Sequence, residues 1–353
     1  METPDAPALF ELPARVEAAQ STPEPAADHR IRVIGHAVAW RVLARLGRDG
    51  HVGQPVLIVG PAGVGKRTVA GALAQLLVCE ADADDRPCGR CRACRLVANG
   101  GHPDVVTTPV PLRIDAARAL QAGLSLSPVE GRVRVTVLPD VDLASSGAAN
   151  SLLKTLEEPP PHAVLILTAV QEANVLPTIR SRCRRVDIKP LPPAEAAAAL
   201  TEHHGVPADR ADLLARLSGG ALGRALAWLD ADEAALADRT AWLDRLFTLV
   251  DADRAGRLAV AAQVARARSG LAEGIAHWLG SFRDVLLLQH GLNEPVTNRD
   301  RLTDLHRLAA SLSPAQAAGG ARATETALGQ LAAHANPQLV LDVLTLALPA
   351  PQR

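Results

Sequence analysis

The chain has 353 residues, a formal net charge of −1 and 2% aromatic residues, with no tyrosine. This length allows two or three domains, and the charge and few rings argue against a basic, base-stacking nucleic-acid surface. No apolar run approaches the roughly 20 residues of a membrane span, and no signal-peptide core is apparent, so a cytoplasmic protein without membrane contact is expected. Residues 1–28, rich in proline and alanine, are expected to form a disordered leader.

The first strong motif is a phosphate-binding P-loop, Gly-Pro-Ala-Gly-Val-Gly-Lys, at Gly60–Lys66. The apolar segment Pro55–Val59 precedes it and a helical apolar stripe follows it, which is the strand–loop–helix context of a P-loop. Arg67 stands where Ser or Thr normally holds the Mg²⁺ of the nucleotide, and a guanidinium has no acceptor atom. Thr68 could replace that hydroxyl only if the helix slipped by one residue, a rotation of about 100°. We expect phosphate binding, with ATP or ADP as candidate ligands, and no efficient hydrolysis.

Four of the five cysteines form a C-x8-C-x2-C-x2-C array at Cys79, Cys88, Cys91 and Cys94. Thiolates with two-residue gaps can converge on one tetrahedral ion, and a set made only of cysteines leaves no open position for catalysis. Disulfides are the alternative, which a reducing cytoplasm disfavours. The array therefore predicts a structural zinc (Zn²⁺) module over residues 79–94.

Strand-like and helix-like segments alternate up to Pro190, which predicts an α/β fold with a parallel sheet flanked by helices. The expected strands are Pro55–Val59, Asp104–Thr107, Val133–Leu138, Val164–Thr168 and Arg185–Ile188, and the expected helices between them lie around Ile114–Ala122 and Ala148–Glu158. A proline cluster follows, and the remaining sequence is rich in alanine and leucine at helical spacing. Two all-α domains are expected there, with breaks at Ser218–Gly220 and Asp230–Glu233.

Two further segments bear on the phosphate site. The strand Val133–Leu138 lies where an ATPase ends a strand in two adjacent acidic residues, but here Asp140 and Asp142 are separated by a valine. Asp140 could keep a weak metal contact, but without a neighbouring acid the attacking water lacks its usual partner. The segment Arg180–Arg185 contains four arginines. It is either a solvated basic loop or an arginine finger that reaches the γ-phosphate on a neighbouring subunit, and the residues alone do not decide.

These motifs occur together in a known family. The P-loop, the cysteine array, Asn150–Pro159 and Ser181-Arg182-Cys183 follow this order in bacterial clamp-loader subunits of DNA polymerase III, and the chain resembles them over about residues 33–225. Its altered phosphate site resembles the non-motor delta-prime type rather than the ATP-hydrolysing tau/gamma type. The resemblance implies an AAA+ P-loop module with an inserted zinc knuckle, an all-α lid and an all-α collar. The corresponding ranges are 29–190, 191–233 and 234–353.

The resemblance also implies roles for individual residues. Arg182 would be the arginine finger acting in trans, Thr168 the sensor 1 residue, and the four cysteines the zinc ligands. Gly223 falls where the sensor 2 arginine is expected, with Arg224 one residue out of place. The positions that would contact a nucleotide are then Gly60, Gly63, Gly65, Lys66, Arg67, Thr68, Asp140 and Thr168.

The expected function is that of a non-motor clamp-loader component, which helps load the sliding clamp onto primed DNA and supplies Arg182 to a neighbouring ATPase. The implied partners are tau/gamma motors and a delta subunit in a heteropentamer of the nucleoid-associated replisome. The sliding clamp and primer–template DNA would be reached through that complex. The chain would then be a subunit of a DNA-directed DNA polymerase, a nucleotidyltransferase. Two alternatives are an active motor that uses Thr68 and Asp140, and a zinc-containing DNA-binding module with a vestigial P-loop.

Overall fold

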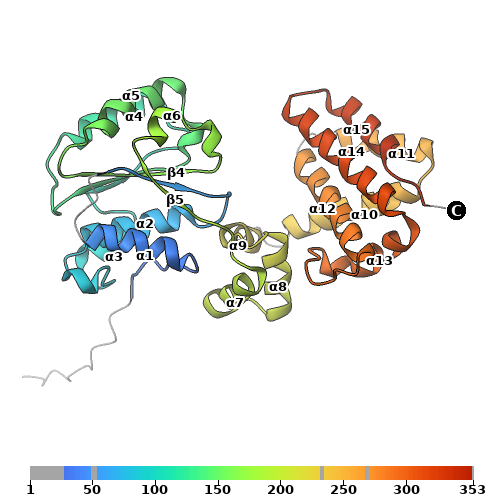
Figure 1. Ribbon diagram of the computed structural model, residues 1–353, viewed down its shortest axis with the longest axis horizontal. Helices are drawn as coiled ribbons and strands as arrows, with labels where there is room; N and C mark the ends of the chain where they lie inside the picture. The colour runs from blue at the N-terminus through green and yellow to red at the C-terminus, as the bar shows by residue number, and fades with distance from the viewer. Residues whose placement is uncertain (1–27, 49–53, 231–233, 267–269, 352–353) are drawn as a thin grey trace, which may run out of the picture.

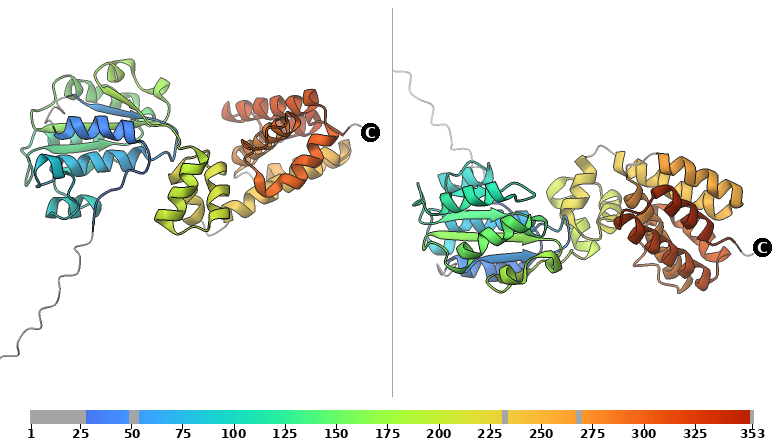
Figure 2. Two further views of the ribbon diagram at one scale, coloured as in Figure 1. Left: turned by 60° about the horizontal axis from the view of Figure 1, so that its bottom comes forward. Right: turned by 90° about the horizontal axis from the view of Figure 1, so that it is seen from above.

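The computed structural model describes residues 28–48, 54–230, 234–266 and 270–351. All but the last residue of the expected leader, and residues 231–233 of the second expected break, lie outside these ranges. Separate hydrophobic cores define an N-terminal α/β unit (28–190), a middle helical unit (191–230) and a C-terminal helical unit (234–351). The three units follow one another along the long axis of the molecule (Figures 1 and 2).

The N-terminal unit is built on a five-stranded parallel sheet in the order β2-β3-β4-β1-β5. The strands are β1 (Val56–Val59), β2 (Val105–Thr107), β3 (Arg134–Leu138), β4 (Ala163–Ala169) and β5 (Arg184–Asp187). Every residue of the two central strands β1 and β4 is buried, because helices cover both faces of the sheet. The predicted parallel sheet is confirmed, and every strand begins and ends within one residue of its expected bounds.

Helices cover the two faces of this sheet in two groups of three (Figure 1). One face carries α1 (Ala37–Arg48), α2 (Lys66–Val78) and α3 (Arg92–Ala98), and the other carries α4 (Ile114–Leu124), α5 (Ser146–Glu157) and α6 (Pro177–Arg180). Short 3₁₀ turns η1 (Ala83–Asp85), η2 (Val141–Leu143) and η3 (Glu172–Asn174) lie between them. Ser145 begins α5 as its N-cap, since its hydroxyl accepts from the Ala148 amide, and two prolines follow its last turn. The α/β part of the prediction is therefore confirmed.

All the regular secondary structure described beyond β5 is helical, as predicted. The middle unit contains α7 (Pro193–His204), α8 (Ala208–Leu217) and α9 (Leu222–Asp230). The C-terminal unit contains α10 (Ala234–Asp251), α11 (Arg254–Arg266), α12 (Leu271–Gln289), η4 (Arg299–Arg301), α13 (Leu302–Ser311), α14 (Pro314–Ala332) and α15 (Pro337–Ala347). Its core centres on Trp278 and Phe282 of α12, both fully buried. Across the described ranges, no helix has the length and apolar character to cross a membrane.

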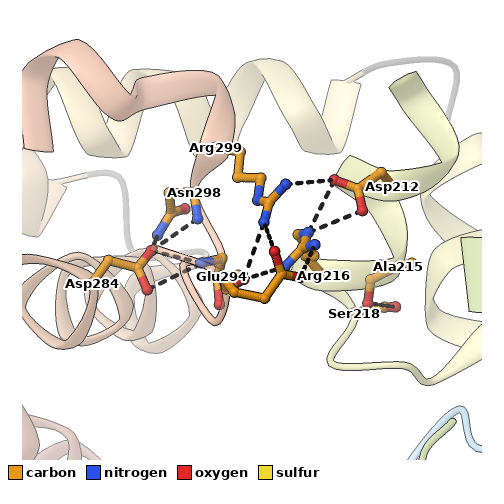
Figure 3. Close-up of polar contacts among 9 residues, drawn as sticks. Asp212, Ala215, Arg216, Ser218, Asp284, Glu294, Asn298 and Arg299 are labelled. Atoms are coloured by element: carbon orange, nitrogen blue, oxygen red, sulfur yellow. Dashed lines mark hydrogen bonds and ion pairs between the residues drawn. The ribbon is translucent and has the colours of Figure 1, made fainter. Parts of the chain in front are cut away.

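An ion-pair network joins the middle unit to the C-terminal unit (Figure 3). Arg216 of α8 bonds Asp212 through Nε at 2.9 and 3.0 Å, and its two terminal nitrogens donate to the backbone and the carboxylate of Glu294 at 2.7 and 2.9 Å. Arg299 donates to the same carboxylate at 2.7 Å. The two arginines hold the pKa of the Glu294 carboxyl below its ordinary value. The network fixes the loop before η4 against α8.

Candidate functional site

The P-loop connects the end of β1 to the first turn of α2, and its glycines are required by the backbone. A Cβ on Gly60 would lie 2.2 Å from the carbonyl oxygen of Ile188. Gly63 and Gly65 have φ values of +74° and +102°, in the left-handed region that side chains rarely adopt. The three predicted glycines therefore shape a loop whose amides lie at the N-terminus of α2, an arrangement suited to anions.

Lys66 is buried at the start of α2 and bends back over the loop. Its Nζ donates to the carbonyl oxygens of Gly60 and Pro61, each at 2.8 Å. Burial lowers the pKa of the Lys66 ammonium, and the nearby Asp140 and Asp142 carboxylates oppose that shift. The ammonium group is thus held at the loop, where a compact positive charge can meet a phosphate.

Arg67, the next residue, forms an ion pair with Asp140 beside the P-loop. Its Nη2 lies 2.6 Å from Oδ2 of Asp140, with 63% of the Arg67 side chain and 17% of the Asp140 side chain exposed. Asp140 follows β3 with φ of +48°, and its amide donates to the hydroxyl of the fully buried Thr168 at 3.0 Å. A cation that contacted this carboxylate oxygen would compete with Arg67 for it. The site therefore carries a positive charge in contact with Asp140, the acidic residue expected to keep at most a weak metal contact.

Thr68 lies apart from this ion pair. The helix α2 begins at Lys66 without the slip that would bring Thr68 into the metal position, and Thr68 lies exposed on a cavity wall. No hydrogen bond joins Thr68 to Asp140 in the part of the chain that the structure describes. The Asp142 carboxylate accepts from the amides at the end of β4, so it has a structural partner already.

A cavity of about 530 Å³ lies between the P-loop and the middle unit, within the size range of small-ligand pockets. Its lining includes His36, Gly65 and Thr68 on one side and Leu226 of α9 on the other. At its edge the Gly223 amide donates to the carbonyl oxygen of the P-loop residue 63 at 2.8 Å. A Cβ on Gly223 would lie 2.8 Å from that same oxygen. The position expected to carry a sensor 2 arginine therefore has no room for a side chain in this arrangement.

The four cysteines of the array come together at the end of α2. Their Sγ atoms all lie within 4.8 Å of one another, and all four are free thiols. The Sγ atoms of Cys79 and Cys91 are 4.0 Å apart, as are those of Cys88 and Cys94. Four sulfurs at the ~2.3 Å Zn–S bond length would be separated by about 3.8 Å, so the set can hold a tetrahedral metal ion. Burial raises the pKa of Cys88, but amide donors from Arg90 and Cys91 outweigh it and hold that pKa at about 7, which favours a thiolate.

Sequence reasoning missed Gln75, which connects the cysteine module to the P-loop helix. Gln75 is fully buried in α2 and bonds three separate backbone groups. Its Oε1 accepts from the Ile31 amide at 2.9 Å, and its Nε2 donates to the carbonyl oxygens of His29 and Cys94 at 2.8 and 2.9 Å. The sequence signal was a single polar residue after the first turn of an otherwise apolar helix, and that signal does not reveal its partners.

The four arginines of the Arg180–Arg185 segment have different environments. Arg180 is half-buried, Arg184 is exposed, and Arg185 pairs with two acidic residues at 2.8 and 3.1 Å. The Arg182 side chain is 33% exposed and forms an ion pair with Glu157, the last residue of α5. The pairing with Glu157 was also missed, although both residues lie in motifs that the sequence analysis named.

The sequence comparisons with known proteins find subunits of DNA polymerase III. The family described as "DNA polymerase III, delta subunit" matches residues 35–192. DNA polymerase III subunit delta' of Pseudomonas aeruginosa is 38% identical over 187 residues, which are 50% of this chain and 56% of that protein. The delta' subunit of Escherichia coli is 34% identical over 191 residues, 53% of this chain and 56% of that protein.

Two further matches extend over more of the chain. DNA polymerase III subunit gamma/tau of Mycobacterium tuberculosis is 30% identical over 325 residues, 84% of this chain and 56% of that protein. A DNA polymerase III gamma subunit-related protein from Thermotoga maritima, solved as a crystal structure, aligns with a TM-score of 0.43 at 20% identity, covering 88% of this chain and 98% of that one. The chain spans about half the length of the curated relatives it matches. These matches support membership of the clamp-loader subunit family of DNA polymerase III, which includes the delta' and the tau/gamma subunits.

Proposed function

We propose that the chain is a delta-prime type subunit of the clamp loader, which does not hydrolyse ATP itself. The observation that carries the proposal is the ion pair between Arg67 and Asp140, because a guanidinium in direct contact with the acid competes with the metal that phosphoryl transfer needs. The P-loop amides and Lys66 keep the capacity to hold a phosphate. In this proposal ATP or ADP binds without being turned over.

The three structural units fit the parts of such a subunit. We assign an AAA+ module to residues 29–190, a lid to 191–233 and an oligomerising collar to 234–353, with Zn²⁺ bound by the four cysteines of the array. The collar would pack with tau/gamma motors and a delta subunit in a heteropentamer of the cytoplasmic replisome. That assembly would load the sliding clamp onto primer–template DNA. The similarity to the delta' subunits of P. aeruginosa and E. coli supports the proposal that the chain is of the delta-prime type.

Within the assembly, Arg182 would complete the ATPase site of a neighbouring motor. Its side chain is partly exposed just beyond the C-terminal end of α6, whereas Arg185 forms ion pairs with two acidic residues. A finger delivered in trans stabilises the charge that develops on the γ-phosphate, and its loss costs roughly 10³–10⁵-fold at the site concerned. Only one of the ring's ATPase sites would be affected, so we expect turnover of the whole complex to fall severalfold.

The test uses the complex reconstituted from this chain with tau/gamma and delta. Arg182→Ala should assemble normally and lower the DNA-stimulated ATPase severalfold. Arg184→Ala, an exposed arginine two residues away, is the matched control and should leave turnover unchanged. If the Arg182→Ala complex turns over ATP and loads clamps like the unmodified one, the finger role is wrong.

A motor function of the tau/gamma type is the second candidate, because the mycobacterial gamma/tau relative matches 84% of the chain while the delta' relatives match about half. The isolated chain saturated with Mg²⁺ and ATP decides between them. Our proposal predicts essentially no turnover, and a motor's rate would reject it. The third alternative, a DNA-binding module, predicts salt-dependent DNA affinity of the isolated chain, which the net charge of −1 disfavours.

A further inference from the structure

The side chain of Arg182 is held by acceptors from its own chain. Its Nη1 donates to the carbonyl oxygen of Thr178 at 2.9 Å and to the hydroxyl of Ser181 at 3.4 Å. Its Nη2 forms the ion pair with Oε1 of Glu157. Thr178 and Ser181 lie in and just after α6, so among the described residues Glu157 is the one acceptor that reaches the Arg182 side chain from a different part of the fold.

The backbone around Arg182 is fixed independently of these side-chain contacts. The Gln54 side chain donates to the carbonyl oxygen of Arg182 at 3.3 Å, and the Arg184 amide donates to the Pro55 carbonyl oxygen at 2.7 Å. Both partners lie directly before β1. The Cα of Arg182 is therefore tied to the central sheet, and the direction of its long side chain is set by the acceptors around the guanidinium.

The contacts of Arg182 leave part of the guanidinium available. A guanidinium has five N–H donors, and the three contacts account for three of them. Nε and one hydrogen of Nη2 remain, and two donors are what a bidentate contact to phosphate requires. A third of the Arg182 side chain is exposed, so the side chain is partly accessible to a neighbouring molecule.

We propose that Glu157 is a positioning residue for Arg182, holding the guanidinium so that its two remaining N–H donors face a phosphate carried by a neighbouring subunit. The inference rests on the proposed function, in which Arg182 acts in trans. Glu157 itself does not touch the nucleotide. Glu157 restricts the orientations of the flexible Arg182 side chain. The guanidinium is then already oriented toward the phosphate when the neighbouring subunit binds.

Glu158 provides a natural comparison for Glu157. It is the next residue, equally acidic and also exposed, and within the described ranges it forms no ion pair. A general effect of negative charge near a neighbour's phosphate would appear for both residues. An effect through Arg182 would appear for Glu157 alone.

The experiment measures kcat and KM for ATP in the reconstituted complex for Glu157→Ala, Glu158→Ala, Arg182→Ala and the double variant of Glu157 and Arg182. Glu157→Ala should lower kcat severalfold with KM for ATP unchanged, and Glu158→Ala should match the unmodified complex. The double variant should be no slower than Arg182→Ala alone, because both changes remove the same contact. Glu157→Gln, which keeps an acceptor oxygen, should recover part of the loss, and it replaces the alanine variant if that one fails to assemble.

The outcomes separate the inference from the proposal beneath it. If Arg182→Ala lowers turnover but Glu157→Ala leaves turnover unchanged or increases it, the positioning role of Glu157 is wrong. The role of Arg182 as the arginine finger is then still supported. The positioning role is also rejected if the two effects multiply. In that case the kcat of the double variant would be lower than that of Arg182→Ala by the same factor by which Glu157→Ala alone lowers kcat. If Arg182→Ala has no effect, the finger role itself is rejected, and the inference with it.

Discussion

Replacing Gln75 by leucine isolates the hydrogen bonds that connect α2 to the cysteine module. Leucine has a similar volume, so the change opens little cavity in the buried core and mainly removes polar contacts. Three backbone groups lose a partner: the amide of Ile31 and the carbonyl oxygens of His29 and Cys94. We expect the segment from residue 28 to 34, and α3 with it, to separate more easily from α2.

The size of the effect follows from where those three groups lie. A buried polar group left without a partner costs about 1–3 kcal/mol. His29 and Ile31 are only half-buried, so water can partly replace the lost bonds, and the lower end of that range applies. The sum is about 3 kcal/mol, which corresponds to roughly a hundredfold more frequent opening of the segment.

Hydrogen exchange followed by mass spectrometry measures that opening directly. Peptides that cover residues 28–34 and 92–98 should lose about a hundredfold in protection in Gln75→Leu, and a chelator should remove bound metal faster. Gln121→Leu is the control, since Gln121 bonds α5 on the opposite face of the sheet and should not alter exchange in these peptides. Unchanged exchange in the Gln75 variant would show that the three bonds do not hold the module.

Two further predictions concern charge. Arg67→Thr supplies a hydroxyl and frees Asp140, so ATP affinity measured by calorimetry should become about tenfold stronger with Mg²⁺ than with EDTA. The free energy of unfolding should change by about 1 kcal/mol or less, because the Arg67 side of the lost ion pair is mostly exposed. Equal affinities would contradict this. Burial, and then Arg239, lowers the pKa of His277, so the neutral imidazole contributes stability above its unfolded pKa of about 6.5, and that contribution is lost as pH falls. The urea midpoint should therefore drop less between pH 7.5 and 5.5 in His277→Gln than in the unmodified chain, and identical drops would reject the reasoning.

Local pattern was sufficient to predict the sheet and the phosphate loop. The buried strands are short apolar runs, and their bounds could be predicted to within one residue. The P-loop could be located because its glycine spacing is typical of few other structures. The cysteine array was equally readable, because its spacing already limits where the four thiols can lie.

The contacts that give the site its character could not be read in this way. Arg67 and Asp140 are 73 residues apart, and Gln75 and Ile31 are 44 apart. Periodicity assigns each residue to a face of its own element, but it does not show which side chain of another element will lie opposite. Lys66 illustrates the same limit at short range, since its bonds to the loop carbonyl oxygens depend on the exact path of the glycines.

The contact between Gly223 and the P-loop constrains how this protein can change over evolutionary time. An arginine introduced at that position would strike the loop before it could reach any phosphate, since even its first carbon has no space. Helix α9 would first have to move away from the loop, and that movement would break the hydrogen bond between the Gly223 amide and the carbonyl oxygen of Gly63. A single substitution of Gly223 by arginine is therefore not enough to bring a guanidinium to the loop, because it must be accompanied by changes that move α9.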